Sequence, residues 1–509
     1  MPTAPLLVVD AGTTALKAAL LDPAGRALAS ASVELPVSHP GPGRAEQHPD
    51  DWWRAFVTAV RQCRAAGPPP AALAVTGQMQ DLVTLDRAGL PVRPALLYSD
   101  LRATAELGAL TAKFGGAWSR AIGNVPDPSS TAAQLLWVRE HDPESWRAVH
   151  GLVFSASGYL LRRAGGRATC DLTTASTTGL LDIEARAWWP PLLEVLGLDV
   201  GLLPELVDGV SVVGDLGRAA AEELDLSAGL PLVHAPGDAA SVTGGLVGER
   251  PGAISISLGT SGWVAALAAL AGAVPGGSAP GGAQLIGPHE AIHHLVGPTW
   301  RESLLIGALL SAGATVDWAR RSYLPGASHA DADLAAEQAG PTDLLMLPSL
   351  AGERSPVRDP LAVGAVVGLR PDTTPAQLYR AAMEGVGYAL RRILTIMGPR
   401  LAEVVEYDAS RWLPVSGGGA RSAVFGQIVA DVLGRPVAPV AAEQAGMHGA
   451  YRAATAALGG VVPVPLAERT DLSTVLRPGA ASEHYGRLAD AHAQLWELLR
   501  PTFGALGGR

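Results

Sequence analysis

The sequence predicts an α/β protein made of two similar halves, and two observations carry this prediction. The stretch "DAGTTALKAAL", residues 10–20, returns as "SLGTSGWVAAL", residues 257–267, near the midpoint of the chain. Both stretches follow an apolar run and lead into another, which is typical of a strand, a tight turn and a second strand. Segments with helical apolar spacing follow in each half. We therefore expect two α/β lobes, residues 1–243 and 244–509.

The expected helices have recognisable ends. Residues 48–67 place apolar side chains at helical spacing after Asp50, the expected N-terminal cap, so Cys63 on the apolar face is predicted to be a core residue. In the second half, Thr374 is expected to cap a helix that starts with a proline. A further helix is expected to stop at Gly434, shortly before another proline.

Composition limits the functions open to this chain. Its 509 residues are 48% hydrophobic, carry a net charge of -10 and include only Cys63 and Cys170. Two cysteines are too few for a disulfide framework, and no apolar run is long enough to span a bilayer, so we expect a cytoplasmic protein. The lack of a Lys/Arg-rich run argues against nucleic acid as a partner. Residues 268–288, rich in Ala, Gly and Pro, predict a loop or an insertion within the second half.

The repeated turn has the chemistry of a phosphate site. Glycine leaves backbone N–H groups open to an anion, and hydroxyl side chains add donors. We assign nucleotide binding to Lys17 and to both turns, which consist of Gly12, Thr13, Thr14, Gly259, Thr260 and Ser261. Asp10 could hold Mg²⁺ directly or through water, and Ser257 takes its place in the second copy. Either turn alone would more often be an ordinary hairpin; the duplication, which also pairs residues 18–20 with 265–267, favours the phosphate interpretation.

Two further stretches hold candidate functional residues. In "PLVHAPGDAASVTGGLVG", residues 231–248, a strand leads into Asp238 at the start of a helix, whose dipole would keep the carboxyl ionised. Asp238 is either a plain helix cap or a base that accepts a hydroxyl proton during phosphoryl transfer. The glycines at 417–419 lie between a strand and a helix. They either let adenine and ribose approach closely or form a tight turn.

Taken together, these stretches resemble the FGGY family of carbohydrate kinases. Seven blocks carry the resemblance in the family's order: "DAGTTALK", "GQMQDLVTLD", "GDAAS", "ISLGTSG", "LPSLAGERSPVRDP", "YRAAMEGVGYAL" and "SGGGARSAVFGQIVADVLGRPV". Within the family, "AEQHPDDWW" and "TGQMQDLVTLDRAGLPVRPALLYSD" are most similar to xylulokinases. The resemblance implies the two-lobed actin and hexokinase-like ATPase fold, with duplicated ribonuclease H-like domains and with ATP and sugar in the cleft between them.

The resemblance also implies roles for individual residues. Asp238 matches the family's proton acceptor and Asp10 its metal-linked aspartate, with Mg²⁺ held through water and the ATP phosphates. The two turns match its phosphate loops, and the three glycines Gly417, Gly418 and Gly419 match its adenosine loop. Gln78, Met79 and Gln80 fall where the sugar is bound. Glu353 and Arg354 would lie at the cleft edge of the second lobe or form a solvated ion pair.

Three positions depart from the xylulokinase pattern, and all lie in the half expected to bind sugar. Gln80 stands where the pattern usually has His, Ser99 where it has Asn, and Gln134 where it often has Lys. A change from His to Gln keeps hydrogen bonding but loses a chargeable ring, so it could alter which hydroxyls are recognised. The reaction is therefore better defined than the substrate.

We expect an ATP- and Mg²⁺-dependent kinase that phosphorylates a ketose, D-xylulose before others, to D-xylulose 5-phosphate. Ribulose, gluconate or another polyol stays open, while "GQMQD" lacks the Arg-Glu pair of the corresponding glycerol kinase block. A different class of function is a filament-forming or chaperone-like ATPase of the same fold, or a sugar-binding regulator without catalysis. Asp238 discriminates between the two, since a filament protein has no reason to place it there. Family analogy suggests a homodimer.

Overall fold

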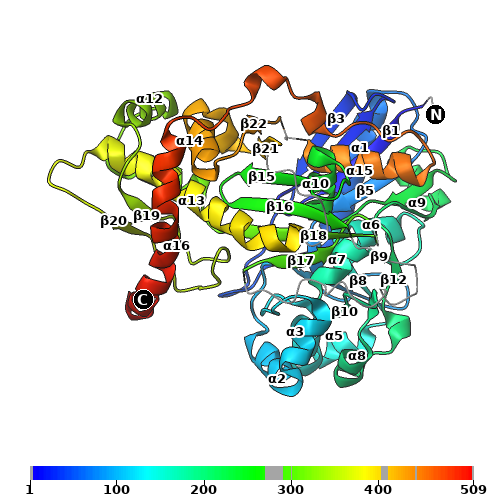
Figure 1. The fold of residues 1–509 in the computed structure, drawn as a ribbon. Helices are drawn as coiled ribbons and strands as arrows, with labels where there is room; N and C mark the ends of the chain where they lie inside the picture. The colour runs from blue at the N-terminus through cyan, green and yellow to red at the C-terminus, as the bar shows by residue number, and fades with distance from the viewer. Residues whose placement is uncertain (1–3, 270–290, 300, 403–410, 442–443, 507–509) are drawn as a thin grey trace.

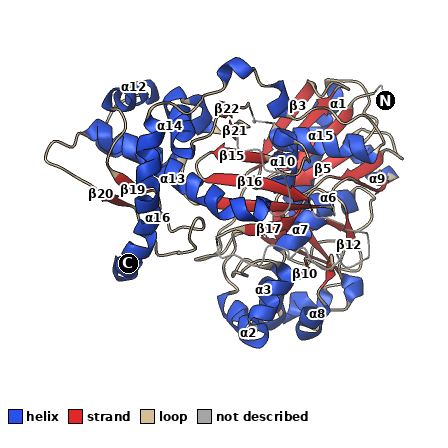
Figure 2. Ribbon diagram, viewed as in Figure 1, coloured by secondary structure: helices blue, strands red, loops and turns tan. Residues whose placement is uncertain are grey.

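The computed structural model describes residues 4–269, 291–299, 301–402, 411–441 and 444–506. Two mixed sheets form the centre of the molecule, and helices cover them (Figures 1 and 2). Most of the segment 268–288 lies outside the described residues, so the loop expected there is not tested. Among the described residues, no helix combines the length and the apolar character needed to cross a bilayer.

The first sheet is six-stranded and is built around a hairpin at its centre. Strands β1 and β2 pair antiparallel, and the next strand inward, β5, pairs parallel with β1. The order of the sheet is β13-β14-β5-β1-β2-β3. Its strands are β1 (Leu6–Ala11), β2 (Ala15–Leu21), β3 (Ala27–Glu34), β5 (Leu73–Gly77), β13 (Ser211–Asp215) and β14 (Pro231–His234). The sheet confirms the strand, turn and strand expected for the first copy of the repeated stretch.

The second sheet repeats this arrangement. Strands β15 and β16 form the antiparallel hairpin, and β21 pairs parallel with β15, in a sheet of order β17-β18-β16-β15-β21-β22. Its strands are β15 (Ile254–Leu258), β16 (Gly262–Ala269), β17 (His293–Val296), β18 (Glu302–Leu309), β21 (Leu413–Ser416) and β22 (Val437–Pro439). The duplication seen in the sequence is therefore a duplication of structure.

The two hairpins differ by one residue in their turns. Ala11 pairs with Leu16 at the end of the first hairpin, whereas Leu258 pairs with Gly262 at the end of the second. Past the turn, the match of residues 18–20 with 265–267 is therefore wrong by one position. A strand that shifts by one residue turns its side chains to the opposite face, so the matched residues beyond the turn are not structurally equivalent.

Helices cover the outer face of the first sheet. Helix α1 (Pro49–Ala65) packs with α6 (Ala156–Arg163) and α9 (Arg218–Leu224), and Cys63 is buried there as predicted. The cap prediction was wrong: His48 caps α1, its Nδ1 accepting from the backbone N–H of Asp50 at 3.3 Å. Pro49 takes the first helical position, where its missing N–H costs nothing, so Asp50 falls inside the first turn.

A smaller unit with its own apolar core extends from the first sheet (cyan and teal in Figure 1). It contains a four-stranded sheet of order β4-β7-β6-β8 and several short helices. Its elements are β4 (Glu46–Gln47), β6 (Met79–Leu85), β7 (Ala95–Leu96), β8 (Gly151–Ser155), α2 (Thr104–Phe114), α3 (Gly116–Ile122), α4 (Thr131–His141), α5 (Pro143–Ala148), β9 (Thr169–Asp171), α7 (Leu172–Thr177), β10 (Leu181–Asp182), β11 (Ala187–Trp188), α8 (Pro190–Leu196) and β12 (Glu205–Val207).

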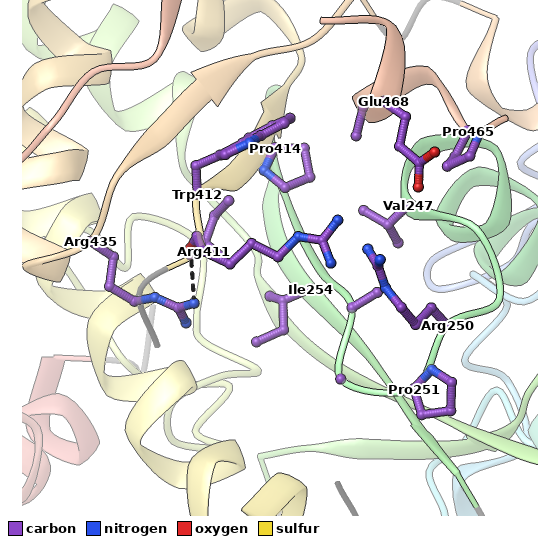
Figure 3. Close-up of a pocket in the computed structure, with 14 residues that line it drawn as sticks. Val247, Arg250, Pro251, Ile254, Arg411, Trp412, Pro414, Arg435, Pro465 and Glu468 are labelled. Carbon is purple, nitrogen blue, oxygen red and sulfur yellow. Dashed lines mark hydrogen bonds between the residues drawn. The ribbon is translucent and has the colours of Figure 1, made fainter. Parts of the chain in front are cut away.

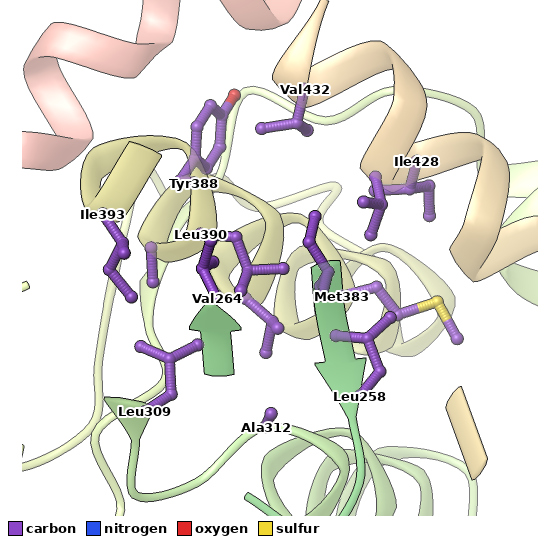
Figure 4. Close-up of a cluster of buried hydrophobic side chains, with 14 of the residues drawn as sticks. Leu258, Val264, Leu309, Ala312, Met383, Tyr388, Leu390, Ile393, Ile428 and Val432 are labelled. Atoms are coloured by element: carbon purple, nitrogen blue, oxygen red, sulfur yellow. The ribbon is translucent and has the colours of Figure 1, made fainter. Parts of the chain in front are cut away.

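A large apolar core forms between the second sheet and its helices (Figure 4). Leu258 and Val264 of the sheet meet Met383 and Ile393 of the long helix α13 (Pro375–Ala402). The helices on this side are α11 (Gly313–Tyr323), α12 (His329–Ala339), α13, α14 (Ala423–Leu433) and α16 (Ala481–Leu506), with the small strands β19 (Leu345–Leu347) and β20 (Ala365–Val367). Thr374 caps α13 and α14 ends at Gly434, both as predicted.

Helices α10 (Asp238–Val247) and α15 (Ala445–Ala457) connect the two sheets (Figure 1). They cross so closely that a Cβ at Gly449 would meet the carbonyl oxygen of Ser241 at 1.8 Å. Although α15 follows the second sheet in the chain, it packs its apolar face on the first sheet, against Leu6 and Val8. The division at residues 243 and 244 stays a prediction, because α10 runs across it.

Candidate active site

The second repeated turn lies between two cavities. Gly259 and Thr260 line a cavity of about 920 Å³ on the side of the second sheet. Ser261, the next residue, lines a cavity of about 460 Å³ that also contains Asp238. A group held at this turn would therefore face both cavities.

The larger cavity has the dimensions and the open backbone expected for a nucleotide. Gly418 and Gly419, two of the glycines expected at the adenosine, form one wall and continue into the short 3-10 helix Gly418–Arg421. Gly417 precedes them with φ 92°, and a Cβ there would meet the carbonyl oxygen of Leu258 at 2.6 Å. Only glycine fits position 417 for two reasons. Its positive φ strains any residue that has a Cβ, and the chain here passes too close to β15 to leave space for a side chain.

Helix α11 fixes the second turn from behind. The backbone N–H of Gly313 donates to the carbonyl of Gly259 at 2.9 Å, and those of Ala312 and Ala314 each donate to Thr260 at 3.0 Å. With its carbonyl groups held in this way, the turn is anchored to α11. A Cβ at Gly313 would lie 2.5 Å from the carbonyl oxygen of Gly259. Sequence reasoning missed Gly313 and also Asp317, Arg321 and Tyr379 of this cavity.

The smaller cavity joins residues from both halves of the chain. Asp238, at the first position of α10, lines it with Met79 and Gln80 of β6, so the structure brings these three candidate residues together. The second half contributes side chains that the sequence did not single out as a group: Trp263, His293, Leu295, Ile306 and Arg354. An isolated Trp or His in an apolar strand carries no signal of its own, whereas Arg354 lay in a recognised block.

The carboxyl of Asp238 is held in a less ionised state than its place at a helix start predicts. Burial, then the nearby charge of Asp10 and that of Asp171, raise the pKa of Asp238 to about 7, against a backbone hydrogen bond from Ala239 that lowers it. The expectation that the helix dipole keeps it ionised was therefore wrong in direction. A carboxyl with a pKa near neutrality suits a proton acceptor.

Asp171 positions the start of α10. Its Oδ1 accepts from the backbone N–H of Gly237 and from that of Thr174, both at 3.0 Å. Its Oδ2 lies 3.7 Å from His234 Nε2 in a fully buried site. Asp171 therefore fixes the residue directly before Asp238, although no sequence motif marked it.

Asp10 is the second-to-last residue of β1, near the first turn and opposite Lys17 in the hairpin. Burial raises the pKa of Asp10, and Lys17 partly offsets this. Its carboxylate faces the start of α15, where a Cβ at Gly446 would come within 2.9 Å of Oδ2. The first turn is held by other contacts: Gln47 Nε2 donates to the carbonyl of Thr13 at 2.7 Å.

Gln80 connects the smaller cavity to the second half of the chain. It has φ 65°, an unusual backbone conformation for a residue other than glycine, and such residues concentrate at functional sites. Its Nε2 donates to the carbonyl and to Oγ of Ser129, at 2.8 and 2.9 Å. Ser129 Oγ donates to Asp127 Oδ1 at 2.6 Å, and Asp127 Oδ2 accepts from Arg358 at 3.2 Å. We call this chain, Gln80–Ser129–Asp127–Arg358, the interlobe relay.

The other residues expected near the sugar lie apart from the cavity. Gln78 is buried and donates to Gln47 Oε1 at 2.9 Å, and Gln134 is buried and donates to the carbonyl of Leu97 at 3.1 Å. Ser99 is exposed, next to Tyr98, which does line the cavity.

Glu353 and Arg354 do not form the solvated ion pair that was one interpretation of their block. Glu353 is buried, and its carboxylate accepts from Ser349 Oγ at 2.8 Å and from the backbone N–H of Leu310 at 3.1 Å. Burial raises the pKa of Glu353 to about 7. Arg354 instead lies exposed in the wall of the smaller cavity.

A duplicated α/β fold with a phosphate-type turn between a nucleotide-sized cavity and a carboxyl-containing one defines a phosphoryl-transfer enzyme of the actin and hexokinase-like ATPase class. Family comparison specifies it further. The N-terminal domain of the FGGY family of carbohydrate kinases matches residues 6–245, and its C-terminal domain matches residues 255–458. The chain belongs to the FGGY family of carbohydrate kinases, which use ATP as the phosphoryl donor.

Individual relatives agree with this assignment. A xylulose kinase from Streptomyces rubiginosus is 37% identical over 470 residues, covering 91% of this chain and 90% of the relative. A glycerol kinase from Methylobacterium nodulans is 33% identical over 476 residues, covering 90% of each chain. Among solved structures, a "xyloylose kinase" from Brucella ovis is 28% identical with a TM-score of 0.85, covering 97% of this chain and 99% of that one.

Proposed function

We propose that this enzyme transfers the γ-phosphoryl group of ATP to D-xylulose, giving D-xylulose 5-phosphate. The observation that carries the proposal is the position of the turn Gly259–Ser261 between the larger cavity and the cavity that contains Asp238. The similarity to xylulose kinases over most of the chain supports the choice of sugar.

In this proposal Asp238 accepts the proton of the attacking primary hydroxyl. Because the transition state of phosphoryl transfer is loose, catalysis depends mainly on orienting the hydroxyl in line with the phosphorus. Asp171 holds Gly237 and so fixes the direction of the carboxyl. Met79 and Gln80 would contact the sugar from one side of the cavity, and Arg354 from the other.

The two turns and the glycine loop would hold ATP. Thr260 and Ser261 offer hydroxyl and backbone donors to the γ-phosphate, and Gly418 and Gly419 leave space for the adenosine. The first turn, Gly12–Thr14, with Lys17, would approach the same phosphates from the other sheet.

Asp10 fits the Mg²⁺ role that we propose for it. A single carboxylate is a typical protein contribution where phosphate oxygens and water supply the other ligands. The described residues contain no group of three or more acidic, His or Cys side chains that would hold a metal without the nucleotide. When bound, Mg²⁺ would offset negative charge on the transferred group.

Other acceptors stay open as alternatives: ribulose, gluconate or another polyol. Gln80 favours keeping them, because it lines the cavity at a position where xylulokinases usually have His. The division into lobes 1–243 and 244–509, a cytoplasmic location and a homodimer also stay proposals.

The test is ADP release by purified enzyme with Mg²⁺ and ATP across a panel of ketoses, polyols and aldonic acids. The proposal expects the highest kcat/KM with D-xylulose. A higher value for another sugar would transfer the assignment to that sugar and make Gln80 the first residue to exchange. No sugar-dependent turnover at all, with ATP binding retained, would favour a regulator or a filament-forming ATPase.

A further inference from the structure

A small pocket adjoins the cavity that contains Asp238. It has a volume of about 50 Å³, and four residues line both spaces: Gln80, Thr177, His293 and Leu295. Since a water molecule occupies about 30 Å³, the pocket has room for roughly one or two waters, or for a single hydroxymethyl group. We call this space the inner pocket.

The shared walls distinguish the inner pocket from a cavity of about 150 Å³ at the other end of the second sheet. That cavity lies at the starts of β15 and β21, beside Ile254 and Pro414 (Figure 3). None of the described residues that line it also borders the cavity of Asp238. A substrate bound next to Asp238 can therefore extend into the inner pocket but not into the cavity of Figure 3.

Side chains from the first half of the chain hold β17 beside the inner pocket. Asn124 Nδ2 donates to the carbonyl of His294 at 2.7 Å, and Asn124 Oδ1 accepts from the backbone N–H of His294 at 2.8 Å. Ser176 Oγ accepts from the backbone N–H of Val296 at 3.2 Å. Because successive side chains of a strand point to opposite faces, fixing this backbone also fixes the direction of His293.

The imidazole of His293 is open to a ligand. It is partly buried and makes no hydrogen bond to any residue that the structure describes. Burial, then the charge of Arg354, lowers the pKa of His293 to about 4; the charge of Asp127 opposes this shift and that of Arg358 adds to it. At neutral pH the ring is therefore uncharged, with one N–H donor and one acceptor nitrogen.

Gln80 offers the complementary atom at the boundary of the inner pocket. Its Nε2 is committed to the two hydrogen bonds with Ser129, and its Oε1 accepts none from the described residues. An imidazole N–H and an amide oxygen together match one hydroxyl group, which accepts from the first and donates to the second. The inner pocket therefore suits the uncharged, hydroxyl-bearing end of a substrate.

We propose that His293 and Gln80 bind the hydroxymethyl group at carbon 1 of the ketose in the inner pocket. In the proposed function, on which this inference rests, the hydroxyl on carbon 5 attacks the γ-phosphorus beside Asp238. In the ring form of a 2-ketopentose the oxygen on carbon 5 is bonded to carbon 2, so only the acyclic form can react there. An acyclic chain places carbon 1 farthest from Asp238, which does not line the inner pocket. His293 is then a specificity-determining residue that the second half of the chain contributes.

The experiment compares D-xylulose with 1-deoxy-D-xylulose, which lacks the hydroxyl on carbon 1, in ADP release by the full-length enzyme. His293→Leu keeps a side chain of similar size without the ring nitrogens, and His293→Gln returns a hydrogen-bonding group. His39→Gln, at an exposed histidine, is the matched control. Loss of one buried hydrogen bond weakens binding about tenfold.

We expect wild type and His39→Gln to prefer D-xylulose over the deoxy sugar about tenfold or more in kcat/KM. In His293→Leu this preference should fall below about threefold, and His293→Gln should lie between the two. The loss in His293→Leu should appear in KM for D-xylulose rather than in kcat, because the contact is made before and during phosphoryl transfer. An unchanged KM for ATP shows that the variants are folded.

Two results would overturn the inference. One is a preference for D-xylulose that is as large in His293→Leu as in wild type. The other is a wild type that uses D-xylulose and the deoxy sugar equally well. Failure of the proposed function has a different signature, since wild type would then not turn over D-xylulose at all, and the assignment of His293 would fall with it.

Discussion

The two repeated turns share one design and differ in what surrounds them. The first follows Asp10, has the longer turn and faces the start of α15. The second follows Ser257, is one residue shorter, and has its carbonyl groups held by the start of α11. The second turn borders both cavities, and the first borders neither. In the proposed site, the first half of the chain therefore contributes the carboxylates of Asp10 and Asp238, and the second half lines the cavity proposed for the nucleotide.

Exchange of the residues before the turns gives the largest expected contrast. If only the first position handles the metal, Asp10→Asn should lower kcat about 100-fold or more, because phosphate charge is then poorly offset. Ser257→Ala should lower it less than about tenfold. The measurement is ADP release at several Mg²⁺ concentrations, and equal losses in both variants would break the comparison.

A substitution in α11 that disturbs the second turn should have a smaller effect, and this effect should be limited to nucleotide binding. In Gly313→Ala the new methyl group would lie 2.5 Å from the carbonyl oxygen of Gly259, so the turn has to move. We expect KM for ATP to rise about tenfold while KM for the sugar stays nearly constant. Gly486→Ala, where a Cβ meets nothing within 4 Å, is the control.

The pH dependence of the reaction tests the ionisation of Asp238, which lies in the first half of the chain. Asp238 has to be ionised to accept a proton, and its pKa is raised to about 7 in the free enzyme. Therefore kcat/KM should be constant well above pH 7 and should fall about tenfold per pH unit below it. A profile that is flat down to pH 5 would contradict the role or the environment of Asp238.

The interlobe relay predicts the smallest effect. Asp127 and Arg358 are partly exposed, so their ion pair is weak, but it orders the loop that holds Gln80. We expect Asp127→Asn and Arg358→Gln each to raise KM for the sugar about threefold, without affecting KM for ATP. Both substitutions together should cost no more than Arg358→Gln alone, because that variant already removes the pair with Asp127 together with the hydrogen bond from Arg358 to the carbonyl of Val125. Arg487→Gln, in an exposed pair of α16, serves as the control.

Local sequence patterns predicted those parts of the fold whose conformation depends only on neighbouring residues. Thr374, Gly434 and the two hairpins are examples, because caps and turns depend on a few neighbouring residues. The prediction that Asp50 caps α1 was wrong because His48 and Pro49, just before it, form the start of the helix instead. The predicted match of residues 18–20 with 265–267 was wrong because the similarity of the two sequences does not reveal that the second turn is one residue shorter.

The candidate site could be predicted only in part. Asp238, Gln80 and the second turn lie in recognisable blocks and meet in space. Asp171, Trp263 and Gly313 come from distant parts of the chain, and only the tertiary structure brings them to the site. The raised pKa of Asp238 was missed because it arises from burial and from two other carboxylates, which no local pattern reveals.

The most direct test of the account is a comparison of Asp238→Asn with wild type in two assays at pH 8, D-xylulose-dependent ADP release and calorimetric binding of ADP with Mg²⁺. The substitution keeps the shape of the side chain and removes the proton acceptor. We expect a loss of turnover of about 1,000-fold, with the nucleotide affinity changed less than about threefold. Turnover within tenfold of wild type would contradict the assignment of Asp238 as the base.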